Sequence, residues 1–153
     1  MSELENRILE KIKSRKEKAD AEQTRKQMEK TQAHLDREAS RTKFDAAFRE
    51  TIKPTVDHLV SWLERNGQKV KRGAPSTPST IELIFELPGK SIVEAPILTI
   101  MPSHDLKSVE LHGFFGVLVK GKNEFDSPSM PIEDLKADAF RAEIMRFLDK
   151  ALS

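Results

Sequence analysis

The sequence predicts an α+β fold, in which a long N-terminal helical arm precedes an α-β-β-β-α domain with a small antiparallel meander sheet packed by two helices. Two observations predict this fold. Residues 1–42 are rich in charged, helix-prone residues and too poor in apolar ones to build a core. In residues 43–153, apolar residues recur first at helical spacing and then in strand-like runs. We therefore divide the chain into an arm, 1–42, and a globular domain, 43–153.

The arm begins with the pattern of a capped helix. Ser2 is followed three residues later by Glu5, as in a capping box. A short apolar stripe recurs every four residues, at Leu4, Ile8 and Ile12. Neither glycine nor proline occurs before Pro54, so one continuous helix is allowed.

A thin heptad pattern follows the stripe. Ala21, Met28 and Leu35 are spaced by seven, and Thr24 and Thr31 follow the first two by three. A stable coiled coil needs apolar positions sustained over about three to four heptads, and this run is shorter. We therefore expect the arm to dock on another protein or to self-associate, with equal weight. The residues assigned to this binding are Leu4, Ile8, Ile12, Met28 and Leu35.

Residues 43–65 form the clearest helix of the domain. Its apolar face is made by Phe44, Phe48, Ile52, Val56, Leu59 and Leu63. Pro54 lies inside this helix and removes a hydrogen bond, so we expect a bend near residues 51–52 or a restart at Pro54. Asn66-Gly67 predicts the end of the helix, because glycine tolerates the left-handed conformation found there.

Four segments predict strands. A short charged run at 69–72 predicts an edge strand. Residues 80–87 alternate between apolar and polar, and Pro88-Gly89 predicts a type II turn after them. Residues 96–101 and 109–121 predict two further strands, and the short connections predict antiparallel order.

The last of these strands shows that the sheet has a second apolar face. Val109, Leu111 and Phe115 point one way, whereas His112 and Phe114 point the other. We therefore expect the second face to be covered by a helix or by another chain.

The C-terminal part predicts a loop and a final helix. Residues 122–131 read as a loop with two prolines. The helix is predicted over 134–152, with Pro131 at its first turn and Glu133 and Asp134 at the positive end of its dipole. Its apolar face is made by Leu135, Phe140, Ile144, Phe147, Leu148 and Leu152.

Composition excludes several classes of function. The chain has no cysteine, which excludes disulfides, thiolate catalysis and cysteine-based zinc sites. The net charge is +1, so no strong global field favours DNA or anionic membranes. No apolar run is long enough to span a bilayer, and the N-terminus is too polar for a secretory signal. We expect a cytoplasmic protein with no membrane partner.

Motifs for catalysis are missing from the sequence. The four histidines form no local metal motif, and no phosphate-binding glycine loop or nucleophile elbow occurs. We therefore expect no metal, no cofactor and no enzymatic activity. One weak alternative is a small-ligand or catalytic site near the third strand, where His104 and His112 would form an acid/base pair beside Phe114.

The arm also carries a moderate basic stretch. Residues 11–30 hold eight basic and four acidic side chains. Candidate nucleic-acid contacts are Lys11, Lys13, Arg15, Lys16, Lys18, Arg25 and Lys26. This makes nucleic-acid association an alternative. The function that the sequence favours is a non-enzymatic protein–protein interaction or assembly module, a homodimer or complex subunit. No motif is specific enough to indicate a family.

Overall fold

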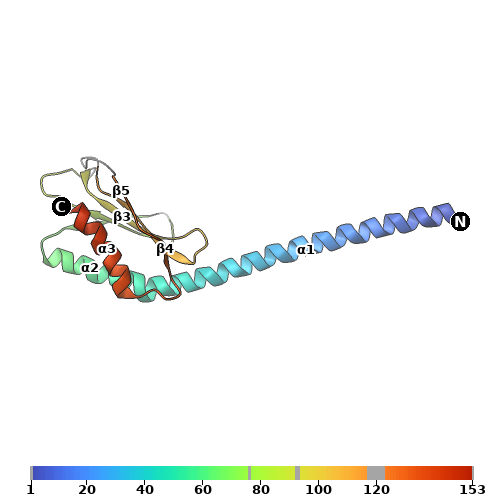
Figure 1. Cartoon of the computed structure of the whole chain (residues 1–153), viewed down its shortest axis with the longest axis horizontal. Coiled ribbons are helices and arrows are strands. Elements are labelled where there is room, and N and C mark those ends of the chain that lie inside the picture. Colours follow the sequence, from blue (N-terminus) through green and yellow to red (C-terminus); the bar gives the residue numbers. More distant parts are fainter. Residues whose placement is uncertain (1, 76, 92–93, 117–122, 153) are drawn as a thin grey trace. The chain divides into compact units, whose positions relative to one another are not determined.

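The computed structural model describes residues 2–75, 77–91, 94–116 and 123–152, and it divides the chain into two units, Met1–Ala39 and Ser40–Ser153. The predicted α+β fold is confirmed: a long N-terminal helix is followed by an antiparallel sheet and a C-terminal helix (Figure 1). The helix α1 spans Glu3–Ala47.

The first unit is a single stretch of helix. The Glu5 N–H donates to Ser2 Oγ at 3.2 Å, as the capping pattern predicts. Every residue from 2 to 39 is exposed to solvent within this chain. This stretch therefore has no core of its own, and its helix is held by backbone hydrogen bonds, surface ion pairs and side-chain hydrogen bonds such as that from Gln32 to Asp36.

The second unit contains a widened helical turn directly after the end of α1. A π-helical segment, η1, spans Phe48–Ile52, and the Lys53 N–H donates to the carbonyl of Phe48. The helix α2, Lys53–Arg65, then begins with Pro54 in its first turn. Proline has no N–H and its ring crowds the carbonyl four residues earlier, so a wider turn before it relieves the conflict. The backbone stays helical through Ile52 and Lys53, so the expected restart at Pro54 does not occur.

The end of α2 is closed as the sequence predicts. Gly67 has a φ of 90°, in the left-handed region. The N–H groups of Gly67 and Gln68 donate to the carbonyls of Glu64 and Leu63, at 3.1 and 2.9 Å. These crossed bonds form a Schellman motif, which turns the chain towards the sheet.

Among the described residues, the sheet contains six antiparallel strands. They are β1 (Val70–Arg72), β2 (Ile81–Phe85), β3 (Ile97–Pro102), β4 (Ser108–Phe114), β5 (Glu124–Asp126) and β6 (Met130–Pro131). The order is β1-β2-β3-β4-β5, and β6 pairs with the other end of β4. β3 is therefore the central strand. The predicted edge strand and the type II turn at Pro88-Gly89 are present, with the Lys90 N–H donating to the Leu87 carbonyl.

One face of the sheet carries the core. The helices α2 and α3 (Ala137–Ala151) both lie on this face (Figure 1). The Phe147 ring of α3 sits among three other rings, with centroids 5.9 Å from Phe85, 5.2 Å from Phe115 and 5.4 Å from Phe125. The predicted apolar faces of both helices are buried there, apart from Phe48 and Leu135, which are partly buried, and Leu152, which is exposed.

Three expectations about the C-terminal half were wrong. The segment 122–131 is not only a loop, because β5 and β6 lie in it. The strand predicted at 109–121 ends at Phe114, and its last part, from residue 117, lies outside the described residues. Pro131 belongs to β6, where it pairs with Ser108 of β4, and α3 starts only after Lys136.

Candidate interaction surfaces

The tip of α1 presents an apolar stripe to solvent. The exposed fractions are 66% for Leu4, 48% for Ile8 and 58% for Ile12. These residues are spaced by four, so they lie on neighbouring turns of one helix face. Burying a side chain of this size contributes about 1.5–3 kcal/mol, and within its own unit the stripe has no apolar surface to pack against.

The heptad residues form a separate strip on the same helix. Met28 and Leu35 are 67% and 52% exposed. Ile8 and Met28 are twenty residues apart, so at about 100° per residue they point to opposite sides of the helix. The Thr24 and Thr31 hydroxyls donate to the Asp20 and Gln27 carbonyls at 2.9 and 3.0 Å, which leaves their methyl groups to extend the strip. The five assigned binding residues therefore make two surfaces, not one.

The basic residues of the arm divide in a similar way. Lys11, Arg15 and Lys18 are spaced by four and three, so they form a row beside the tip stripe. Lys13 and Lys16 lie off that row. Arg25 and Lys26 both make ion pairs along the helix, Arg25 with Glu22 and Glu29 and Lys26 with Glu22. These partners partly neutralise the second half of the predicted nucleic-acid surface.

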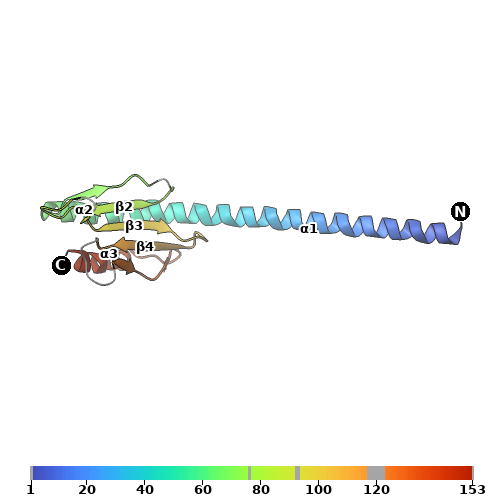
Figure 2. The same ribbon diagram turned by 90° about the horizontal axis from the view of Figure 1, so that it is seen from above.

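The face of the sheet opposite α2 and α3 carries an ordered set of side chains. Figure 2 looks onto this face, along which β2, β3 and β4 lie side by side. One row across all five strands reads Lys71, Ile84, Ile97, Phe114 and Glu124. The three central apolar residues are half-buried and the two charged end residues are exposed. Neither α2 nor α3 lies on this side of the sheet, and the three apolar side chains keep part of their surface exposed.

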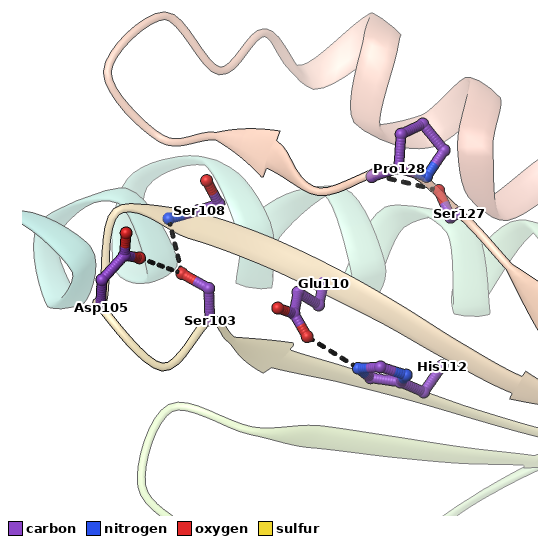
Figure 3. Close-up of polar contacts among 7 residues, drawn as sticks. All are labelled: Ser103, Asp105, Ser108, Glu110, His112, Ser127 and Pro128. Carbon is purple, nitrogen blue, oxygen red and sulfur yellow. Dashed lines mark hydrogen bonds and ion pairs between the residues drawn. The ribbon is translucent and has the colours of Figure 1, made fainter.

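A polar row follows on the same face. Glu82, Thr99 and His112 are paired across β2, β3 and β4. The His112 imidazole Nε2 lies 2.9 Å from Glu110 Oε2, two residues earlier on the same strand (Figure 3). Met101 and Glu110 make the next row.

The turn between β3 and β4 is held by its own side chains. Asp105 accepts a hydrogen bond from Ser103 Oγ at 2.7 Å, and Ser103 Oγ accepts one from the Ser108 N–H (Figure 3). Asp105 also accepts a hydrogen bond from the Lys107 N–H at 3.0 Å. The Ser103 bond, followed by the Lys107 bond, lowers the pKa of Asp105 below its usual value. Leu106 is buried at a φ of 62°, so these bonds hold a left-handed turn.

The same turn separates the two histidines of the catalytic alternative. His112 is paired with Thr99, and the ladder continues to the Pro102–Val109 pair before the turn that contains His104. At least three residues of strand, about 10 Å, therefore separate the two positions along the sheet. His112 lies beside Glu110, and this separation counts against the acid/base pair that the catalytic alternative requires.

A hollow of about 880 Å³ lies at the end of the hairpin, away from Phe114 and His112. Its walls come from the end of α1, from η1, from the β3–β4 turn and from the segment before α3. Its charged residues are of both signs: Lys43, Glu50, Lys107 and Glu133. This lining has no histidine and no convergent set of like groups, so it indicates no particular chemistry.

In the described part of the chain, no helix is long and apolar enough to cross a bilayer. In the same residues, no cluster of three or more histidine or carboxylate side chains is placed to hold a metal ion. In comparisons with known proteins, no family model, no curated protein and no solved structure matches the chain.

Proposed function

We propose that this protein is a non-enzymatic interaction module that uses the tip of its arm to bind another protein. The observation that carries the proposal is the apolar stripe of Leu4, Ile8 and Ile12, exposed on a helix that has no core of its own. Recognition of a helix in a groove uses apolar anchors at this spacing. We place this function in the cytoplasm, because the chain has no cysteine and disulfides are rare in that compartment.

The charges beside the stripe indicate the kind of groove it fits. Lys11 follows Ile8 by three residues and Arg15 follows Ile12 by three, so both lie next to the anchors. A partner groove with an apolar floor and acidic residues along one border would match both features. The charges then select the partner and speed its approach, while the anchors supply most of the affinity.

The same basic row supports the nucleic-acid alternative less well. Lys11, Arg15 and Lys18 give three phosphate contacts at most, and the two basic residues further along are engaged with Glu22 and Glu29. A nucleic acid would also leave the three apolar anchors in water. We therefore place nucleic acid second and the protein groove first.

Site-specific photo-cross-linking tests the proposal. A photoreactive phenylalanine analogue replaces Ile8 in the full chain, and in a matched control it replaces Glu10, which lies about 200° round the helix. We expect one protein to cross-link to position 8, in cells that make this chain, and little to cross-link to position 10.

Three further outcomes decide between the alternatives. Leu4→Ser together with Ile12→Ser should abolish the cross-link at position 8, because each lost anchor weakens binding by about tenfold or more. Equal cross-linking at positions 8 and 10 would count against a specific docking face. Cross-linking to nucleic acid in place of protein would favour the second alternative.

A further inference from the structure

The geometry points to a second interaction surface: we infer that two copies of this chain pair through the open face of the sheet, β3 against β3, about a two-fold axis that runs along β3. This inference goes beyond the proposed arm function and does not depend on it. Its occupant is a second copy because the face is complementary to itself.

The complementarity follows from the strand order. β3 is the middle strand, so a two-fold axis along it exchanges β2 with β4 and β1 with β5. In the first row this operation places Lys71 of one copy opposite Glu124 of the other. It also places Ile84 against Phe114 and Ile97 against its own equivalent. A Lys71–Glu124 pair of opposite charge therefore lies at each end of the apolar centre of the interface.

The second row obeys the same operation. Glu82 of one copy comes opposite His112 of the other, and Thr99 meets its equivalent on the axis. Glu110 lies 2.9 Å from one ring nitrogen of His112, so the incoming Glu82 carboxylate can accept a hydrogen bond from the second ring nitrogen when the imidazole is protonated. In the third row Met101 meets Met101. No like charges face each other in the rows described.

The size of the face sets the expected strength. Five strands about 4.8 Å apart and three rows along them cover at most about 500 Å² per copy, because only the first row is described on all five strands. A pair therefore buries at most about 1,000 Å², which is at the small end of specific interfaces. Two sheets packed face to face align within about 30°, so the long Lys71 and Glu124 side chains still reach each other. We expect a reversible dimer that forms at micromolar concentrations.

A charge-reversal cycle tests this surface in the full chain. Lys71→Glu places like charges at both symmetric contacts, and so does Glu124→Lys. Each single variant should weaken the dimer at least about tenfold in sedimentation velocity, and the double variant should recover most of the loss because both pairs are restored. Lys136→Glu makes the same change of charge beside α3, on the other side of the sheet, and should leave the dimer unchanged.

The outcomes separate this inference from the arm proposal. A wild-type chain that stays monomeric at about 200 μM would overturn the inference, since an interface of this size should associate there. So would a double variant no stronger than the two singles. Both charged positions are exposed, so these variants should fold. A dimer that persists when Leu4, Ile8 and Ile12 are changed to serine supports the sheet face, whereas loss of the dimer in that variant overturns it.

Discussion

Gly113 of β4 lies against the ring of Phe147 on α3, so closely that a Cβ added to Gly113 would stand 2.5 Å from Phe147 Cε2. The same Cβ would lie 2.8 Å from Phe125. The glycine therefore makes room for the aromatic cluster that joins α3 to the sheet. The role of Gly113 is packing on the helix side of the sheet. This packing does not limit the side chains on the open face of β4.

Gly113→Ala should destabilise the domain by about 1–3 kcal/mol, because both neighbours are buried and have little space to move. Urea unfolding of the full chain measures the change. Gly73→Ala is the matched control. The nearest atoms to its added Cβ belong to Glu82, whose carboxyl end can rotate away while its Cβ stays at 3.0 Å, so the expected cost is smaller, about 0.5–1 kcal/mol. Equal costs for the two variants would contradict the packing role.

Asp105 makes the stability of the domain depend on acidity. Its pKa is lowered in the folded state, mainly by the Ser103 hydroxyl, so its stabilising effect is present above the unfolded pKa near 3.8 and is lost as the pH falls through the folded value. Asp105→Asn should therefore lower stability at pH 7 and reduce the loss of stability that the wild type shows on acidification. Urea unfolding at several pH values checks this, and parallel curves for the two proteins would contradict it.

The arm stripe should contribute nothing to the stability of the globular domain. Changing Leu4, Ile8 and Ile12 to serine should move the unfolding free energy of the Trp62 fluorescence transition by about 0.5 kcal/mol or less, since these side chains are exposed. Met28→Ser with Leu35→Ser is the control on the opposite side of the helix and should behave alike. A large loss in the first variant alone would show that the stripe folds back on its own chain.

The sequence predicts an element correctly where its hydrophobic periodicity or its end signal is strong. The spacing of Phe44 to Leu63 and the Asn66-Gly67 stop define the second helix, and alternation defines β2. The two strands inside 122–131 are only three and two residues long, too short for periodicity to show. Pro131 suits a helix start, but pairing with Ser108 on β4 places it in the sheet instead. The π-helical turn has no signal of its own beyond the proline that follows it.

The candidate surfaces were only partly readable. The apolar spacing identifies the tip stripe, yet only the uninterrupted helix shows that Met28 and Leu35 lie on the other side of it. A second apolar face on the sheet follows from the alternation in β4. Its self-complementary order depends on the strand pairing, which brings Lys71 and Glu124 to opposite ends of one row, and a single sequence does not reveal that register.

The arm and the sheet face should act independently, the arm in binding another protein and the sheet face in pairing two copies, and the solution mass of three full-length proteins distinguishes the two surfaces. Light scattering at tens of micromolar should give about twice the 17.4 kDa chain mass for the wild type and for the serine variant of Leu4, Ile8 and Ile12. Ile97→Lys, which places two ammonium groups on the proposed axis, should give the single-chain mass. A monomeric serine variant beside a dimeric Ile97→Lys protein would contradict the account, because the arm would then be the self-association element.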